Sequence, residues 1–377
     1  MRFVLAPDSF KESMTAPEAV AAMERGIRTV FPDAQCIGVP MADGGEGTTD
    51  ALVAALGGTH VTVYAHDALG RPVRARYGYV ADEHLAIIET AAAAGLDLIA
   101  QAERDPRITS TYGVGEMIID ALDHGAVRFV VGLGGSATND GGAGMLQAIG
   151  ARLLDAAGTD LPPGGSALTR LATIDLAGLD PRLGSAVFQI ASDVTNPLLG
   201  SDGASFVFGP QKGADAQVVR ELDDALGTYA RALTAKTGRD VASHAGAGAA
   251  GGLGAAFLAF FDASMQRGVD LVMAAANLED KLPGADYVFT GEGSVDSQTL
   301  RGKTPFGVAQ AARRNGVPVI AFAGRLGDDA DVLYSHGFAA LVPIIQGVSD
   351  LPSALVHGPV NLERAVATTC RLLALRH

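Results

Sequence analysis

The segment VVGLGGSATNDGGAG, from Val130 to Gly144, constrains the fold more than any other part of the chain. Its last thirteen residues include six glycines, although a glycine within a helix or strand costs roughly 0.5–1 kcal/mol relative to alanine. The β-branched run before it predicts a buried strand, and the following AGMLQAIGARLL has apolar residues at helical spacing. The glycines therefore fall where a strand turns into a helix, a place where α/β proteins bind anions on backbone amides.

Composition excludes several classes of protein. A chain of 377 residues suggests two domains or one large one, and its net charge of −14 argues against nucleic acids and anionic membranes as general partners. Two cysteines provide no disulfide framework, and no signal peptide is evident, so we expect a cytoplasmic protein. The apolar stretch 245–261 is rich in glycine and shorter than the ~20 residues of a spanning helix. It predicts a buried loop and helix, and we expect no membrane association.

The order of predicted elements indicates an α/β fold with two domains. Strands and helices alternate at both ends of the chain, which is typical of a parallel sheet. In between, residues 59–90 alternate apolar and polar positions with two turns, which predicts an antiparallel meander. Helices are expected over 114–122 and 216–237. We therefore expect a doubly wound domain from residues 1–60 plus 284–377, with a second mixed α/β domain inserted over 61–283.

The glycine-rich segment also has polar side chains that suit an anion. Ser136, Thr138, Asn139 and Asp140 offer oxygen and amide groups beside the bare amides of Gly134 and Gly135. That mixture suits a phosphate with its Mg²⁺, which prefers oxygen ligands. A tight structural connection is the alternative interpretation.

A second anion site is predicted in SQTLRGKTP, which follows Asp296. The segment nearly matches the phosphate-loop pattern, but Ser297 stands where the first glycine belongs. Pro305 is placed to open a helix, and a lysine such as Lys303 beside a helix N-terminus can bind an anion. The alternative is a solvated lysine at a helix cap.

Further charged residues follow other predicted strands. Asp8, Ser9 and Lys11 share the loop APDSFKES, which follows the first strand, although a surface ion pair would explain Asp8 and Lys11 equally well. The loop MADGGEGT, which follows the second strand, contributes Asp43, Gly44, Gly45 and Glu46. Asp193 comes after a predicted strand, and Lys212 stands beside a glycine in FGPQKGA. No histidine cluster and no GxSxG elbow is present, which argues against a structural metal and a Ser-His-Asp hydrolase. Glycine-rich loops with lysines beside them and carboxylates after strands favour phosphoryl transfer over hydride or acyl transfer.

Taken together, these segments resemble the bacterial glycerate kinase family, type I. The resemblance rests on APDSFKESMTA, ADGGEGT, GLGGSATNDGGAGMLQAIGA, SDVTNPLLG, VFGPQKGA, GAGAAGGLGAAFLAF and ADYVFTGEGSVDSQTLRGKTPFGVA. It implies phosphorylation of D-glycerate by ATP with Mg²⁺, giving 2-phosphoglycerate on routes of glyoxylate or glucarate breakdown. It also implies a Rossmann- or flavodoxin-like domain and a second domain of the restriction-enzyme-like type.

Roles for individual residues follow as hypotheses from that resemblance. We expect Asp193 to position or deprotonate the attacking hydroxyl, Lys11 to stabilise the transferred phosphoryl group, and Asp8 to hold Lys11. Glycerate is expected in a cleft between the domains. Asp43 and Glu46 would bind Mg²⁺ or substrate hydroxyls, and the remaining candidates would bind phosphate or carboxylate: Ser9, Gly44, Gly45, Gly134, Gly135, Ser136, Asn139, Asp140, Lys212, Asp296 and Lys303.

Two alternatives stay open at this point. One is a kinase of another small hydroxy acid, such as tartronate or erythronate. The other is a nucleotide-binding sensor that has lost catalysis. The sequence predicts no particular oligomeric state.

Overall fold

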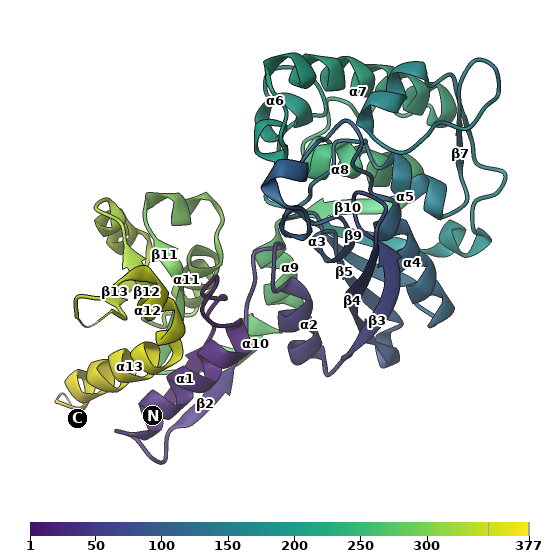
Figure 1. Ribbon diagram of the computed structural model, residues 1–377. Coiled ribbons are helices and arrows are strands. Elements are labelled where there is room, and N and C mark those ends of the chain that lie inside the picture. The colour runs from purple at the N-terminus through teal and green to yellow at the C-terminus, as the bar shows by residue number, and fades with distance from the viewer. Residues whose placement is uncertain (346, 376–377) are drawn as a thin grey trace. The chain divides into compact units, whose positions relative to one another are not determined.

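The computed structural model describes residues 1–345 and 347–375, which form two compact units (Figure 1). Unit 1 comprises Met1–Asp43, Asp50–Gly57 and the chain from Arg267 onward, and unit 2 comprises Gly44–Thr49 and Gly58–Gln266. The division falls earlier than the expected boundary at residue 284, because α9 (Gly268–Ala275) and α10 (Leu278–Lys281) pack against α11 (Thr304–Arg314). Residues 376–377, which close the expected range, lie outside the described residues.

Unit 1 is built on a five-stranded parallel sheet in the order β13-β12-β11-β1-β2. In chain order within the unit this is 2-1-3-4-5, the doubly wound flavodoxin-like arrangement, so the predicted fold class is confirmed. The strand order reverses between β1 and β11, and ligands bind at the carboxyl ends of such a pair. The strands are β1 (Arg2–Leu5), β2 (Gln35–Gly38), β11 (Tyr287–Val295), β12 (Val319–Leu326) and β13 (Phe338–Pro343).

Helices α1 (Ala16–Arg28) and α13 (Gly358–Ala374) lie side by side on one face of this sheet (Figure 1). Helix α1 begins after Thr15, which forms a capping box with Glu18. The two helices approach closely at Gly26, where a Cβ would lie 2.6 Å from the Glu363 carbonyl oxygen. Helix α11 contacts β11 and β12. The other helices assigned wholly or mainly to this unit are α2 (Thr48–Leu56) and α12 (Leu351–Val356).

Unit 2 is built on a six-stranded mixed sheet in the order β10-β9-β6-β5-β4-β3. Strands β3, β4 and β5 form the antiparallel meander that the alternating pattern predicts. Strands β5, β6, β9 and β10 run parallel, so their carboxyl ends share one edge. The bounds are β3 (Thr59–His66), β4 (Pro72–Val80), β5 (Leu85–Glu89), β6 (Arg128–Gly132), β9 (Val187–Ala191) and β10 (Asp262–Gln266).

The core of unit 2 includes stacked aromatic rings, with the Phe129 and Phe188 centroids 4.7 Å apart and Phe257 packed against Phe188. Its longest helix, α7, spans Ala216–Thr237 as the sequence predicts. The other helices are α3 (Ala91–Ala94), α4 (Tyr112–Asp123), α5 (Ala143–Ala148), α6 (Ala204–Phe208) and α8 (Ala249–Phe260). Among the described residues, no helix is both long enough and apolar enough to cross a membrane.

The helix expected after the glycine-rich segment is shorter than its apolar spacing indicates. Helix α5 ends at Ala148, and a two-stranded sheet follows, of β7 (Arg152–Leu154) and β8 (Thr173–Asp175). The cause is Gly150, whose φ is 104° and whose Cβ would lie 2.0 Å from the Gly178 carbonyl oxygen. Short 3-10 turns occupy Ala81–Glu83, Leu96–Leu98, Gln101–Glu103, Gly165–Arg170, Pro181–Ser185, Pro210–Lys212, Ser297–Arg301 and Ala330–His336.

Candidate active-site residues in the two units

Asp8 lies three residues after the end of β1. We call the place between the carboxyl ends of β1 and β11, where the strand order reverses, the switch point of unit 1. The backbone N–H of Asp8 donates to the Gly291 carbonyl oxygen of β11 at 2.9 Å. Its carboxylate accepts hydrogen bonds from the Thr304 hydroxyl at 2.5 Å and from the Ser9 N–H at 2.6 Å. The side chain is 8% exposed. Asp8 therefore ties the end of β1 to the first residue of α11.

Burial and, after it, the negative charge of Asp43 together raise the pKa of Asp8 to about 7. The hydrogen bonds from Thr304 and Ser9 favour the charged form and oppose this increase. Asp43 follows β2 in the loop expected to contribute to the site. The structure thus brings these two predicted carboxylates into electrostatic contact at one sheet edge.

Glu292 is a functional candidate that the sequence analysis missed. It lies in β11, where its Oε1 accepts a hydrogen bond from Thr299 and its Oε2 is 3.3 Å from Lys303 Nζ. Burial raises the pKa of Glu292, although the Lys303 ammonium opposes that effect. A signal was present: TGEGS follows the apolar YVF run, so a carboxylate ends a third strand at the same edge. Lys303 occupies the cap position of α11, beside its N-terminus as predicted.

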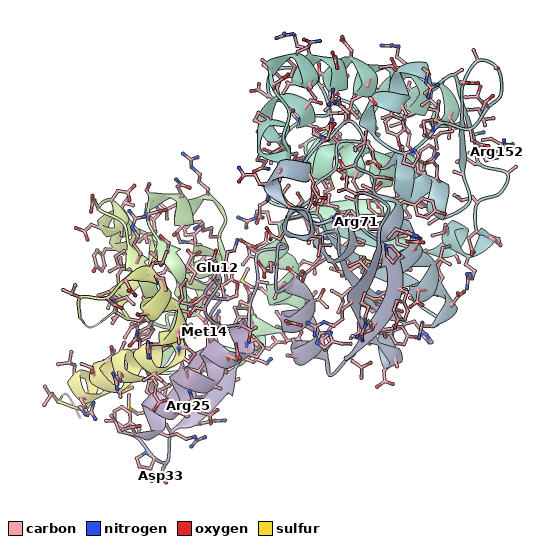
Figure 2. The ribbon with its side chains drawn as sticks, viewed as in Figure 1. Glu12, Met14, Arg25, Asp33, Arg71 and Arg152 are labelled. Atoms are coloured by element: carbon pink, nitrogen blue, oxygen red, sulfur yellow. The ribbon has the colours of Figure 1, made fainter. Side chains whose placement is uncertain are left out.

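The expected contact by which Asp8 would hold Lys11 is not formed. Both Asp8 oxygens accept from Ser9 and Thr304, and the Lys11 side chain is exposed. The loop turns sharply after Lys11 because Glu12, labelled in Figure 2, has a φ of 62°. Asp296 caps the turn Ser297–Arg301, accepting a hydrogen bond from the Gln298 N–H at 2.9 Å. Its carboxylate therefore fixes the segment that leads to Lys303.

In unit 2, the glycine-rich loop (Gly132–Gly144) joins β6 to α5 at the edge shared by the parallel strands. It packs directly on Gly44 and Gly45, since a Cβ at Gly134 would lie 2.9 Å from the Gly45 Cα. Two of the predicted loops thus meet backbone to backbone, which requires glycine. Gly134 and Gly135 are exposed, and we call these two residues the tip of the loop.

The polar residues after the tip support the loop instead of facing solvent. Asp140 is fully buried, and its carboxylate accepts from the Thr111 N–H at 2.8 Å, the Gly142 N–H at 3.0 Å and the Gly144 N–H at 3.1 Å. Burial raises the pKa of Asp140, and these bonds oppose that effect. Asn139 is also fully buried and donates to the Ser205 hydroxyl. In this structure both side chains are occupied in holding the loop, and ligand binding by Asp140 or Asn139 stays a prediction.

Lys212 is predicted to bind phosphate or carboxylate, but in this structure its ammonium is buried against the glycine-rich loop. The side chain is 2% exposed, and Nζ donates to the Thr138 carbonyl oxygen at 2.6 Å and to the Ser136 hydroxyl at 3.1 Å. Burial lowers the pKa of Lys212 to about 7, against the opposing charge of Asp140. The sequence could not show this, because its partners lie 74 and 76 residues away.

Asp193 and Glu46 are the exposed carboxylates predicted for unit 2. Asp193 is two residues beyond β9, and so lies by the shared edge of the parallel strands. Glu46 is in the loop that packs on the glycine-rich loop. Within residues 1–345 and 347–375, no group of three or more His, Cys, Asp or Glu side chains could hold a metal ion. Magnesium binding by Asp43 and Glu46 remains a hypothesis.

Comparison with known proteins identifies the family. The model of the glycerate kinase family matches residues 3–374. A glycerate kinase of Halalkalibacterium halodurans is 49% identical over 96% of this chain and 95% of its own length. The glycerate 2-kinase of Escherichia coli is 46% identical, covering 100% of this chain and 98% of that one. A crystal structure described as glycerate kinase 2 from Salmonella typhimurium LT2 matches with a TM-score of 0.90 and 47% identity, over 100% of this chain and 98% of that one.

These matches span nearly the whole chain and confirm the resemblance found in its motifs. Each unit thus has candidate residues of a kinase at the edge of its own sheet: the carboxylates and Lys303 in unit 1, and the exposed glycines in unit 2. The chain belongs to the glycerate kinase family and is a phosphotransferase that acts on an alcohol group.

Proposed function

We propose that this protein transfers the γ-phosphoryl group of ATP to the 2-hydroxyl of D-glycerate, giving 2-phosphoglycerate and ADP. The family supports a glycerate kinase, and the name of the E. coli relative supports position 2. The structural observation that carries the proposal is the cluster at the switch point of unit 1. There a buried Asp8, Glu292 and Lys303 meet at the carboxyl ends of β1 and β11, where doubly wound sheets bind ligands.

The reaction needs a group that receives a proton. The hydroxyl oxygen of glycerate forms a bond to the γ-phosphorus while the bond from that phosphorus to the bridging oxygen breaks. ADP leaves with that electron pair, and the hydroxyl proton passes to a base. We assign the base to Asp193, an exposed carboxylate that follows a parallel strand.

Lys11 would stabilise the negative charge on the transferred phosphoryl oxygens. Its ammonium is exposed and follows Asp8 by three residues in the same loop. Because Asp8 bonds to Ser9 and Thr304, its role is to fix the start of that loop rather than to contact Lys11. Positioning of this kind accounts for much of the catalysis in phosphoryl transfer.

Magnesium fits the oxygen donors at the switch point. Mg²⁺ in phosphoryl-transfer sites uses one or two carboxylates and takes its other ligands from water and substrate phosphates, so a cluster of three protein ligands is not required. The repulsion between Asp43 and Asp8 shows a local excess of negative charge that a cation would relieve. We assign Asp43 to this role, with Glu46 as the second candidate. When bound, the ion neutralises charge on the phosphate oxygens.

The test is a panel of acceptors with ADP release as the readout. Purified protein with ATP and Mg²⁺ is given D-glycerate, L-glycerate, tartronate or erythronate. We expect kcat/KM for D-glycerate to exceed the others by at least tenfold. A higher value for another acid would replace the proposed substrate, and ATP binding without ADP release from any acid would indicate a sensor.

A further inference from the structure

The buried ammonium of Lys212 joins two parts of unit 2 that are distant in sequence. Lys212 ends the short turn Pro210–Lys212 that follows α6. Both of its hydrogen bonds go to the glycine-rich loop, one to the Ser136 hydroxyl and one to the Thr138 carbonyl oxygen. The backbone on either side of Ser136 is also fixed, since the Leu96 N–H donates to Gly135 O at 2.8 Å and the Ala137 N–H donates to Ala94 O at 2.8 Å.

This arrangement determines what the Ser136 hydroxyl can do. An ammonium has three donors and no acceptor, so Ser136 Oγ must accept from Lys212. The hydroxyl hydrogen then points elsewhere, and within the described part of the chain Ser136 Oγ donates to no protein acceptor. Ser136 is 7% exposed and follows the exposed tip. The Ser136 hydroxyl is therefore a hydrogen-bond donor without a protein acceptor among the described residues, and it lies beside two exposed glycines after β6.

We propose that Lys212 is a positioning residue that holds Ser136 as a hydrogen-bond donor to an anionic oxygen of a ligand bound at the tip, Gly134 and Gly135. The inference rests on the proposed function in one respect: the ligand is one of the two substrates. A glycerate carboxylate and an ATP phosphate share the required chemistry. In either case Lys212 acts through Ser136 and touches no ligand itself.

The charge of Lys212 matters to this role. The charged group that acts on it is Asp140 of the glycine-rich loop, whose negative charge favours the ammonium. Two further titratable groups lie close to this pair: Tyr229 of α7 interacts with Asp140, and Arg104 donates to the carbonyl oxygen of Gln211, the residue before Lys212. Burial lowers the pKa of Lys212 to about 7. Above that pH the neutral amine can accept from Ser136, which turns the hydroxyl hydrogen away from the ligand. Ligand affinity at the tip should therefore fall as pH rises through 7.

The experiment measures binding to the full-length protein by calorimetry, separately for D-glycerate and for a non-hydrolysable ATP analogue with Mg²⁺. Ser136→Ala should weaken one of the two ligands by about tenfold to a hundredfold, the range expected for a lost hydrogen bond to a charged group. Lys212→Met should weaken the same ligand, and the double variant should bind no more weakly than the weaker single variant. Which ligand responds identifies the anionic group.

Matched controls are Ser185→Ala and Lys236→Met, both at exposed positions. Neither should change affinity more than twofold. If Lys212 has only a structural role, its effect will be the same with and without Ser136, and additive losses in the double variant overturn the proposal. If Lys212→Met does not fold, Lys212→Arg replaces it: the variant should bind with a flat pH profile between pH 6 and 8, while the unmodified protein loses affinity above pH 7.

The outcomes separate this inference from the proposed function. Normal binding of both ligands by Ser136→Ala overturns the inference and leaves phosphoryl transfer to glycerate intact. Binding at the tip without ADP release overturns the proposed reaction and retains the site. If neither ligand binds the unmodified protein, both fail together.

Discussion

Replacing Asp8 with asparagine removes a buried carboxylate while keeping the size of the side chain. The variant therefore tests whether the charged form of Asp8 lowers the folding stability of unit 1. The folded protein holds the proton of Asp8 up to a pH of about 7, whereas the unfolded chain releases it near 3.8. Between these values the folded state binds more protons than the unfolded state. The contribution of Asp8 to folding stability therefore falls as pH rises through this window and is lowest above 7.

The magnitude follows from the pKa difference. Each pH unit within this window lowers the free energy of unfolding by about 1.36 kcal/mol, so the change from pH 5 to about 7 is roughly 2.7 kcal/mol. Asparagine does not titrate. The stability of Asp8→Asn relative to the unmodified protein should therefore increase by about 2–3 kcal/mol between pH 5 and pH 8. We expect turnover to fall in the same variant.

Amide hydrogen exchange is the suitable assay, because two units can unfold separately and a single unfolding free energy is then undefined. Opening free energies of peptides from β1 and β11 would be compared at pH 5 and pH 8. Asp33→Asn is the matched control, at an exposed turn between α1 and β2 (Figure 2). If Asp8→Asn and the unmodified protein show parallel pH dependence, Asp8 is charged in the folded state and the reasoning is wrong.

Three further variants test other parts of the molecule. Asp193→Asn should fold normally and lower kcat by at least a hundredfold, because the proton acceptor is lost; steady-state kinetics with near-normal kcat would remove Asp193 from the mechanism. Lys11→Ala should lower kcat at saturating ATP, and a change confined to the KM for ATP would make Lys11 a binding residue only. Gly251→Ala should destabilise unit 2 by about 2–4 kcal/mol and lower its melting temperature, since φ there is +65° and a Cβ would lie 2.0 Å from the Thr138 carbonyl oxygen. An unchanged melting temperature would show that the segment around Gly251 can move away from the glycine-rich loop at little cost in free energy.

Much of the fold could be predicted from local patterns. The helix expected over 216–237 is α7, and the alternating pattern locates the meander β3–β5. The pattern failed at α5, because Gly150 ends the helix through a contact with Gly178, which is far along the chain. Local spacing has no information about such a contact.

The candidate site was predicted less completely, because residue type does not reveal burial. Asp140 and Lys212 are polar residues in glycine-rich segments, which is typical of ligand contacts, yet both are buried and support the loop. Glu292 was overlooked although TGEGS follows an apolar run that predicts a strand, because its place beside Asp8 depends on β11 lying next to β1. That neighbour relation is a property of the sheet order and cannot be seen in the sequence around Glu292.

Product identity tests the proposed reaction most directly. The protein would be incubated with D-glycerate, ATP and Mg²⁺, coupled to enolase, pyruvate kinase and lactate dehydrogenase, with and without phosphoglycerate mutase. We expect NADH to be consumed at the same rate in both reactions, because enolase accepts 2-phosphoglycerate directly. NADH consumption only when the mutase is present would identify the 3-isomer and show that the reacting hydroxyl has been assigned incorrectly.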